Sequence, residues 1–495
     1  MKVLAKIEKS LSFWFIIVSS LVFFFLRFPS LFEPNWYGDE GIYQTLGIAI
    51  SRGELLYRDI FDNKPPLLYF LYSLVNSDQF LIRLLSLVFG LLAIIVFYKL
   101  AEKILNNLRV SFIATIIFAT LFGLPLIEGN IANAENFMLL PNILAGLFVF
   151  KSISETSQNK KLKLEILAGL IIGISFLFKV VAIFDFAAFF VFLFFSNYSN
   201  KFLDIFKKEN LLREIKNLLP FAISFLTPIV LVTLFFTING AFSYFLKAVL
   251  FNNVGYVSYG NKFIIPQGLL ILKLSMLLLF SAFLFYKRKV LNPGFVFISL
   301  WLAFSLFDAF FSQRPYTHYV LVLLPSFSLL VGFFLLNNKA SKLSGVIVIS
   351  TFIAVLLSFT FFVKTIFYYQ NFISFVLGQK SVAKYQSFFD GNTPNDYVVA
   401  SFINLYAKSS DNIFIWGNNA QVYKLTEKLP PGRYSVAYHI TSYKDGIENT
   451  RNGLKASKPR FIIIMPNASM YPFEMPQYFE RININNIIIY EKISK

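Results

Sequence analysis

Residues 11–28 read LSFWFIIVSSLVFFFLRF, and this stretch decides the class of fold because Arg27 is its single charge. A helix needs about 20 predominantly apolar residues to cross the hydrocarbon core of a bilayer. Comparable stretches recur near residues 81–99, 110–127, 137–150, 164–179, 180–196, 217–237, 267–286, 293–311, 318–337 and 344–363. The sequence therefore predicts a polytopic α-helical membrane protein with about eleven transmembrane helices.

The composition agrees with this prediction and narrows the chemistry. The chain has 495 residues, of which 56% are hydrophobic and only 15% are charged, whereas soluble proteins carry about a quarter charged residues. It contains no cysteine, which excludes disulfides, thiolate zinc sites and cysteine nucleophiles. It also contains no P-loop and no G-x-G-x-x-G pattern, so the sequence gives no support to direct nucleotide chemistry.

The formal net charge of +18 could suggest a nucleic-acid partner, but the placement of the charges indicates membrane topology instead. With a cytoplasmic N-terminus, 20 Lys and Arg fall in the inside segments 2–9, 99–109, 151–163, 201–216, 287–289 and 339–342. The outside loops hold only Arg52, Arg58, Lys64, Lys247, Lys262 and Arg314. Because cytoplasmic loops are enriched in basic residues, we predict a plasma-membrane protein with its C-terminus outside and no nucleic-acid partner.

Two polar regions are predicted on the outer side. The first outside loop, at about 29–80, contains apolar residues at helical spacing over 42–50, which predicts an amphipathic helix on the membrane surface that ends at Gly53. From about 366 to 495 short apolar runs alternate with helical patterns, which predicts a small extracytoplasmic α/β domain after a membrane module of residues 1–365. The predicted strands are 413–416, 434–437, 461–465 and 487–490, and the predicted helices are 396–408, 420–428 and 473–479.

The first outside loop carries two candidate functional motifs. Asp39 and Glu40 lie in the run WYGDEGIY at the start of the predicted helix, where carboxylates either cap a helix or act as a general base. Lys64 begins the run KPPL, in which two prolines fix the backbone. Its ammonium either extends to the membrane interface or binds a lipid phosphate, and these two interpretations are compatible.

Three further motifs border the membrane segments. Glu135 lies in ANAEN, either as a solvated residue of a turn or as a second carboxylate facing the outside. Lys179 interrupts the apolar run 164–196, which we interpret as a tight hairpin with a cation at its tip or at a ligand. Arg314 opens RPYTHY, where it is either an interfacial residue or a bidentate phosphate ligand.

Taken in order, these motifs resemble those of the GT-C glycosyltransferases. The Asp39 and Glu40 pair is followed by Y-x-D-x-x-x-x-K-P-P-L-x-Y over 57–69, A-x-A-E-x-x-x-x-x-P over 132–141, and R-P-Y-x-H-Y-x-x-x-x-x-P over 314–325. More narrowly, the chain is similar to the bacterial glycosyltransferase family 39 branch, which is related to protein O-mannosyltransferases and lipid A aminoarabinose transferase. The resemblance covers about residues 10–365.

The resemblance implies an inverting transfer from a polyprenyl-phosphate-linked sugar at the extracytoplasmic face. It implies Asp39 as catalytic carboxylate with Glu40 as its partner, and Glu135 as a second acid for acceptor or metal. It implies Lys64, Arg314 and Lys179 at the carrier phosphate. The substrate-lining positions it implies are Tyr43, Tyr57, Tyr316, His318 and Tyr319. Some relatives use a divalent metal at the carboxylates, and Asn63 replaces a residue that is often acidic or His, so a metal cofactor stays open.

Two other classes of function remain. A lipid or sugar transporter or flippase should place paired charges near the middle of the bilayer and show repeated halves, and no repeat is present. A non-catalytic scaffold of the cell envelope would not need Asp39, Lys64 and Arg314. The partners predicted besides membrane lipid are the polyprenyl-phosphate-linked sugar and a glycolipid, polysaccharide or protein acceptor. The sequence does not name the sugar.

Overall fold

A computed structural model describes residues 2–198, 204, 207–253, 261–262, 264–314, 316–336, 350, 361–466 and 468–493. The chain divides into two compact units. The first, here called the helical unit, comprises Met1–Phe28, Leu85–Phe235 and Asn253–Phe367. The second, here called the mixed unit, comprises Pro29–Leu84, Phe236–Asn252 and Tyr368–Lys495. The first outside loop thus groups with the C-terminal region, whereas the prediction assigned it to the membrane module.

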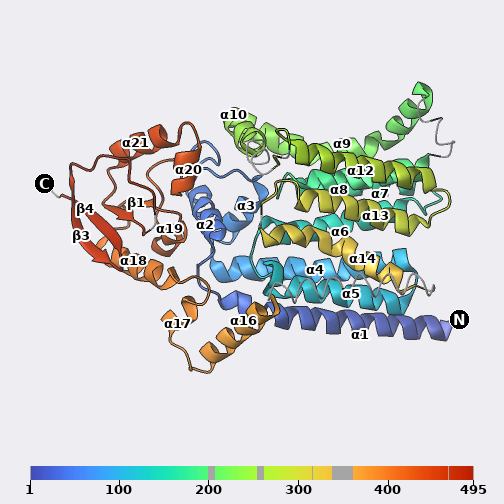
Figure 1. Ribbon diagram of the computed structural model, residues 1–495, viewed down its shortest axis with the longest axis horizontal. Coiled ribbons are helices and arrows are strands. Elements are labelled where there is room, and N and C mark those ends of the chain that lie inside the picture. The colour runs from blue at the N-terminus through green and yellow to red at the C-terminus, as the bar shows by residue number, and fades with distance from the viewer. Residues whose placement is uncertain are drawn as a thin grey trace. The chain divides into compact units, whose positions relative to one another are not determined.

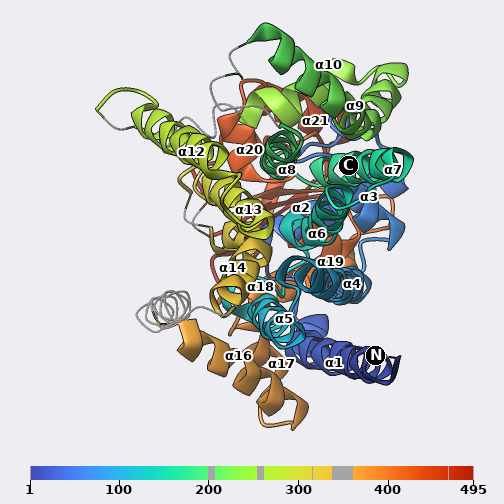
Figure 2. The same ribbon diagram turned by 90° about the vertical axis from the view of Figure 1, so that its right-hand side faces the viewer.

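The helical unit consists of long apolar helices (Figures 1 and 2). They are α1 (Lys2–Arg27), α4 (Gln79–Leu105, whose first residues belong to the mixed unit), α5 (Leu108–Gly123), α6 (Ala134–Ser152), α7 (Gln158–Phe176), α8 (Ala182–Asn197), α9 (Lys208–Ile238), α12 (Gly268–Lys287), α13 (Pro293–Ala309) and α14 (Leu324–Phe334), with 3-10 turns η2 (Pro125–Ile127) and η5 (Thr317–Leu323). Every predicted span from 11–28 to 318–337 falls on such a helix. The predicted span 344–363 lies almost wholly outside the described residues.

Among the described residues, five helices are long and apolar enough to cross a membrane by length and composition. Small residues let these helices approach closely, as is common where lipid provides no hydrophobic driving force for association. A Cβ on Gly173 of α7 would lie 2.3 Å from the Phe225 carbonyl oxygen of α9, so the two backbones touch at this position. Stacked rings fill wider spacings, for example Phe189 against Phe297 with centroids 5.6 Å apart.

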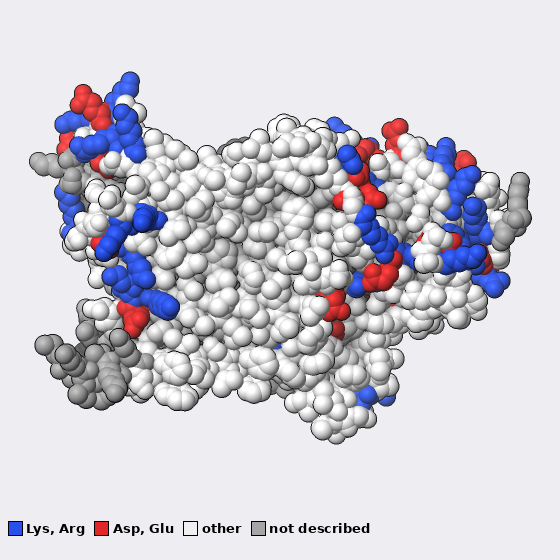
Figure 3. All heavy atoms as spheres, turned by 180° about the vertical axis from the view of Figure 1, so that it is seen from behind, with Lys and Arg blue, Asp and Glu red and all other residues white. Residues whose placement is uncertain are grey.

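Charged side chains are distributed unevenly over the helical unit. Lys and Arg gather at the end where α1 begins, and the flank of the helices is almost free of charge (Figure 3). Lys151, Lys160, Lys287 and Lys289, which belong to predicted inside segments, are all exposed. An uncharged flank is what contact with lipid requires, because a charge in hydrocarbon is costly. The orientation of the unit stays a prediction.

We expect reporter fusions at Lys208 and Lys455 to report opposite sides of the membrane. The reason is the basic bias of the loops, which favours a cytoplasmic position for the segment around Lys208. Alkaline phosphatase and green fluorescent protein fusions at the two positions measure this directly, since each is active on one side only. If both positions reported the same side, the predicted topology would be wrong.

The mixed unit is built on a four-stranded sheet with strand order β1-β2-β4-β3. The strands are β1 (Ile413–Trp416), β2 (Phe461–Ile464), β3 (Tyr478–Ile484) and β4 (Ile487–Lys492). β1 and β2 are parallel, and the other pairs are antiparallel. The helices and turns of the unit are η1 (Phe28–Phe32), α2 (Gly38–Ser51), α3 (Leu67–Leu74), α10 (Phe242–Leu246), η4 (Lys247–Phe251), α16 (Phe361–Val376, which begins in the helical unit), α17 (Val382–Gln386), α18 (Thr393–Tyr406), α19 (Gln421–Thr426), α20 (Ala437–Ser442) and α21 (Gly446–Ser457).

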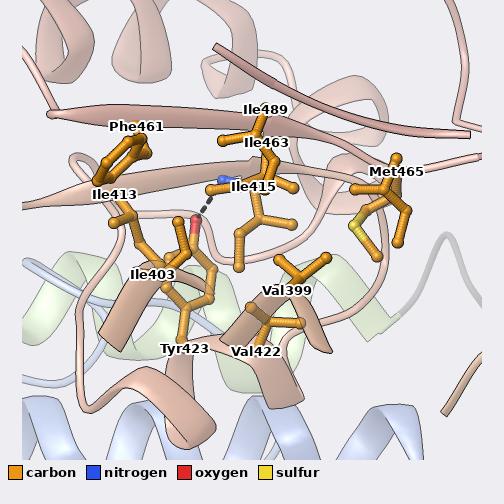
Figure 4. Packing of buried hydrophobic residues seen from close by; sticks show 11 residues of the cluster. Val399, Ile403, Ile413, Ile415, Val422, Tyr423, Phe461, Ile463, Met465 and Ile489 are labelled. Atoms are coloured by element: carbon orange, nitrogen blue, oxygen red, sulfur yellow. Dashed lines mark hydrogen bonds between the residues drawn. The ribbon is translucent and has the colours of Figure 1, made fainter. Parts of the chain in front are cut away.

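The core of the sheet lies against α18 and α19. Ile413, Ile415, Ile463 and Ile489 point from the strands toward the helices, and Tyr423 of α19 fills the space beneath them (Figure 4). The Tyr423 hydroxyl accepts a hydrogen bond of 3.0 Å from the Ile415 backbone N–H. This bond satisfies a polar group that would otherwise be buried without a partner.

Two of the predicted elements in the C-terminal region are wrong. Residues 434–437 form no strand, because Ala437 begins α20 and its N–H donates to the Gly417 carbonyl at 2.8 Å. Residues 473–479 form no helix. Pro476 lacks the N–H that a helix interior needs, and Tyr478 then opens β3. The predicted strands at 413–416, 461–465 and 487–490 and the helices at 396–408 and 420–428 are confirmed.

The helix predicted over 42–50 exists as α2 but is buried in the mixed unit. Residues from Glu40 to Ala49 are buried, because α2 packs between α3 and α19. Glycines permit this close packing: a Cβ on Gly41 would lie 2.5 Å from the Gln421 backbone nitrogen, and one on Gly47 would lie 3.0 Å from that of Ser73. The predicted position on a membrane surface is therefore wrong, and α2 is a rigid core element.

Candidate active site

Asp39 and Lys64 form an ion pair at the start of α2. Asp39 lies in the first turn of this helix, where the helix dipole favours a negative charge. Its Oδ2 accepts a hydrogen bond of 3.0 Å from the Tyr43 hydroxyl one turn later and lies 3.4 Å from Lys64 Nζ. The Asp39 side chain is 37% exposed and that of Lys64 is 21% exposed. Tyr43 therefore fixes the Asp39 carboxylate, and the partial exposure of both side chains leaves the pair open to a ligand.

The backbone of Lys64 is held by two buried tyrosines. The Tyr57 hydroxyl donates to the Lys64 carbonyl at 2.7 Å, and the Lys64 N–H donates to the Tyr69 hydroxyl at 3.2 Å. Pro65 and Pro66 follow and lead into α3. The Lys64 ammonium lies over the Tyr43 ring, 4.8 Å from its centroid, which gives a modest cation–π attraction. The predicted residues Tyr43 and Tyr57 thus shape the site by holding Asp39 and Lys64.

Asp62 is a buried carboxylate on the other side of the Lys64 ammonium. Its Oδ2 accepts a hydrogen bond of 2.7 Å from the Tyr69 hydroxyl and lies 3.7 Å from Lys64 Nζ. Burial, together with the nearby charge of Asp62, raises the pKa of Tyr69 well above its ordinary value, so Tyr69 remains a neutral donor. Lys64 therefore lies between a partly exposed carboxylate, Asp39, and a buried one, Asp62.

Glu40 points into the interior, away from this exposed pair. Arg83 of α4 donates from Nε to Glu40 Oε1 at 2.7 Å and from Nη2 to Glu40 Oε2 at 2.5 Å. Arg83 Nη1 also lies 3.2 Å from Glu33 Oε2. Glu33 in turn accepts hydrogen bonds from Trp36 and Tyr368 at 2.9 and 2.6 Å. This Glu33–Arg83–Glu40 triad is fully buried, and it ties the start of α2 to α4.

The helical unit contains the second group of predicted residues. Glu135, in the first turn of α6, pairs with Lys179 and lies 3.7 Å from His318 Nε2. His318 Nδ1 is 2.8 Å from Glu128 Oε2, and Thr317 donates to the other oxygen of Glu128 at 2.5 Å. Three predicted residues, Glu135, Lys179 and His318, thus form one cluster.

Aromatic rings cover this cluster. Lys179 Nζ lies 4.1 Å from the centroid of the Tyr319 ring. The Tyr316 ring stacks on that of His318 with centroids 5.6 Å apart. Arg314 is half-buried between α13 and η5. In the described part of the chain, no group of three or more His, Asp or Glu side chains has the geometry to hold a metal ion.

Three residues near the sites were not singled out from the sequence. Arg83 looks like an interfacial residue at the start of a membrane span. Asp62 is one of several acids in the first loop and matches no motif position. His439 lies far along the chain in α20, yet its Nε2 is 3.6 Å from Asp62 Oδ1. Only the fold brings residues so distant in sequence together, so no local pattern could have indicated His439.

Comparisons with known proteins relate this chain to membrane glycosyltransferases. Residues 63–211 match the family model described as dolichyl-phosphate-mannose-protein mannosyltransferase. This match and the shared fold confirm the predicted resemblance to the GT-C glycosyltransferases. Together with the apolar helices, they identify a multi-pass membrane protein.

Two solved structures illustrate the similarity. ArnT from Cupriavidus metallidurans, bound to undecaprenyl phosphate, matches with a TM-score of 0.60 at 12% identity, over 98% of each chain. The archaeal oligosaccharyltransferase AglB from Archaeoglobus fulgidus, in complex with an inhibitory peptide and a dolichol-phosphate, matches with a TM-score of 0.50 at 11% identity, over 92% of this chain and 69% of that one. No curated protein matches the sequence. At these identities the likeness concerns the fold.

Proposed function

We propose that the protein is an inverting glycosyltransferase. It moves a sugar from a polyprenyl-phosphate carrier to an acceptor hydroxyl at the extracytoplasmic face of the plasma membrane. The observation that carries the proposal is the Asp39–Lys64 pair, in which a partly exposed carboxylate and a partly exposed ammonium lie 3.4 Å apart on a buried framework. The family match and the fold shared with ArnT and AglB, whose structures hold polyprenyl phosphates, support this chemistry.

In this mechanism Asp39 is the general base. The acceptor hydroxyl attacks the anomeric carbon from the side opposite the phosphate, and its proton passes to Asp39 Oδ2. A bond forms between the acceptor oxygen and the anomeric carbon, while the bond from that carbon to the phosphate oxygen breaks. The electron pair of the broken bond stays on the polyprenyl phosphate. Proton transfer to a positioned base of this kind typically contributes 10²–10⁴-fold to the rate.

Lys64 has two partners in this mechanism. Without a donor its ammonium is shared between Asp39 and Asp62. A bound phosphate competes for the ammonium and draws it from the more exposed of the two carboxylates, Asp39. Oδ2 of Asp39 keeps its hydrogen bond from the Tyr43 hydroxyl and accepts the proton in place of the ammonium, and Lys64 stabilises the charge that grows on the leaving phosphate. The step assigns this charge to Lys64.

The cluster of the helical unit keeps the roles predicted from its motifs. We propose Lys179 and Arg314 as further cations for the carrier phosphate and Glu135 as an acidic residue for the acceptor. Glu135 is almost fully buried beside Lys179, whereas Asp39 is 37% exposed, so Asp39 is better placed to meet an acceptor hydroxyl. Glu40 is paired at both oxygens with Arg83, and we propose that it positions the first turn of α2.

A reconstituted transfer assay tests the proposed function. The purified protein in lipid vesicles is given a radiolabelled polyprenyl-phosphate sugar with candidate glycolipid, polysaccharide or protein acceptors. We expect the label to move to one acceptor class and the anomeric configuration to invert. Mass spectrometry of envelope glycans from cells with and without the gene narrows the choice of sugar. Donor movement across the bilayer without transfer would instead indicate a flippase.

Replacing the phosphate cations should slow transfer strongly. We expect Lys64→Ala and Arg314→Ala each to lower kcat/KM about 30- to 1,000-fold, because a charge-assisted contact made in the transition state is worth about 2–4 kcal/mol. Initial rates at varied donor concentration measure the effect. Arg58→Ala is a matched control, since Arg58 is an exposed cation of the same loop that pairs with its neighbour Asp59. Wild-type rates for both test variants would contradict the assignment.

A further inference from the structure

The three residues that precede Lys64 all contact one segment of the C-terminal region, residues 433–445, here called the clamp segment. The Phe61 N–H donates to the Arg433 carbonyl at 2.9 Å. The Phe61 ring meets the rings of Tyr434, His439 and Tyr443 edge-on, with centroids 5.1, 5.5 and 4.8 Å away. Phe61 is almost fully buried as a result.

The next two residues are held through polar groups of the same segment. His439 Nε2 faces Asp62 Oδ1 at 3.6 Å, and the Tyr443 hydroxyl hydrogen-bonds the Asn63 side chain. Burial lowers the pKa of His439 to about 4, although Asp62 opposes this shift. The imidazole is therefore neutral at pH 7. Its Nε2 faces Asp62 without competing with Lys64 as a cation.

The clamp segment is itself anchored. Arg433 Nη1 lies 3.0 Å from Asp445 Oδ2, and the Tyr434 hydroxyl donates to Asp445 Oδ1 at 2.8 Å. The Arg433 guanidinium also lies over the rings of Phe61 and Tyr244, 4.9 and 5.1 Å from their centroids. The planar guanidinium of Arg433, enclosed by these rings and paired with Asp445, has little conformational freedom left. The segment can therefore act as a fixed support.

The first loop needs such a support. Between the end of α2 at Ser51 and the start of α3 at Leu67, the chain forms no regular helix, and Tyr57 has a left-handed φ of 70°. Side chains on such loops are less precisely placed than those on helices or strands. The placement of the Lys64 ammonium thus depends on what holds residues 61–63.

We propose that the clamp segment positions Lys64 for phosphate, with His439 and Tyr443 as positioning residues that act through Asp62 and Asn63. This inference rests on the proposed transferase function and extends it to the C-terminal region. A displacement of about 1 Å at a reacting group can lower a rate about 100-fold. The C-terminal region is accordingly a working part of the site, although its sequence lies some 370 residues away from Lys64 by number.

Two conservative substitutions test the proposal in the intact protein. His439→Phe keeps a ring against Phe61 but removes both nitrogens, and Tyr443→Phe removes only the hydroxyl that reaches Asn63. We expect the double variant to lose about 10- to 100-fold in kcat, with an unchanged melting temperature. Tyr471→Phe is a matched control, because Tyr471 is a tyrosine of the same unit whose hydroxyl has no hydrogen-bond partner among the described residues.

A double-mutant cycle separates positioning of Lys64 from a general structural role. If the two residues act through Lys64, their substitution should cost little once Lys64 is already Ala, because coupled residues are not additive. Full additivity in the Lys64→Ala background would overturn the proposal. So would wild-type kcat in the double variant.

A crosslinking measurement keeps the test independent of the transfer assay. The chain has no cysteine, so Asn63→Cys and Tyr443→Cys introduce a single pair of thiols. We expect a short bifunctional maleimide to join them in the intact protein and to leave the control pair of Asn63→Cys with Tyr471→Cys unjoined. Failure of the first pair to crosslink would overturn the clamp whatever the transfer assay shows. Absence of transfer by wild type, with the crosslink formed, would contradict the proposed function instead.

Discussion

Asp39→Asn should abolish sugar transfer, with a loss of about 10²–10⁴-fold in kcat that reflects the removal of a general base. The amide keeps the size of the side chain and can still accept hydrogen bonds from Tyr43 and Lys64, whose donors lie 3.0 and 3.4 Å from Oδ2. It cannot take up a proton at neutral pH. The purified variant in vesicles, assayed with saturating donor and acceptor, gives the measurement.

Controls distinguish loss of the base from loss of the fold. Glu54→Gln changes an exposed acid of the same loop and should leave kcat unchanged. Insertion into membranes and the melting temperature of Asp39→Asn should match wild type, because Asp39 is partly exposed and the amide can keep the hydrogen bond from Tyr43. Full activity of Asp39→Asn would rule out this residue as the base. Asp62 would then be the next carboxylate to test, since it also lies within 4 Å of Lys64.

The membrane helices were predictable because lipid imposes a strong constraint on sequence. A helix in hydrocarbon must be apolar on nearly every side over about 20 residues, and that signal is local. Even α6, predicted only over 137–150, is a helix, which begins at Ala134 and carries Glu135 in its first turn. The pairing of Glu135 with Lys179 and His318 was less predictable, since it depends on how helices pack.

The first loop shows where a local pattern misleads. Its apolar residues at helical spacing are real, but residues 40–49 of α2 are all buried, because α3 and α19, the latter contributed by a segment about 370 residues later, pack against this helix. Residues 434–437 were misjudged for the same reason. Tyr434, for example, is buried against Phe61 of the first loop, and not within a sheet.

The residues of the candidate site that belong to sequence motifs were predictable. Those that join the site only through contacts in the fold were not. Asp39, Lys64, Tyr43 and Tyr57 come from motifs and meet in the structure. His439 belongs to no motif, and a lone histidine in a soluble segment carries no signal of its own. Asp62 is notable for being buried close to both Lys64 and His439, which the sequence does not reveal.

Arg83→Met should destabilise the protein by about 3–5 kcal/mol, because removing one partner of a buried ion pair leaves uncompensated charge. Here the substitution removes the cation that pairs with two buried carboxylates. Arg83 Nη1 lies 3.2 Å from Glu33 Oε2, and Arg83 Nη2 lies 2.5 Å from Glu40 Oε2. Methionine fills a similar volume, so the effect reports charge and not a cavity. Thermal unfolding of the purified variants in detergent, followed by intrinsic fluorescence, measures the change.

Neutralising both carboxylates of the same triad should restore part of the stability that Arg83→Met loses. Adding Glu33→Gln and Glu40→Gln to Arg83→Met removes the stranded charges, and neutral replacement of a whole buried ion triad is often tolerated. We therefore expect the triple variant to melt above Arg83→Met. Arg52→Met, which removes an exposed arginine that donates to the Glu427 carbonyl, should melt like wild type. Because Glu40 follows Asp39 in the first turn of α2, Arg83→Met should also lower transfer. A variant that melts like wild type would show that the triad does not hold this turn.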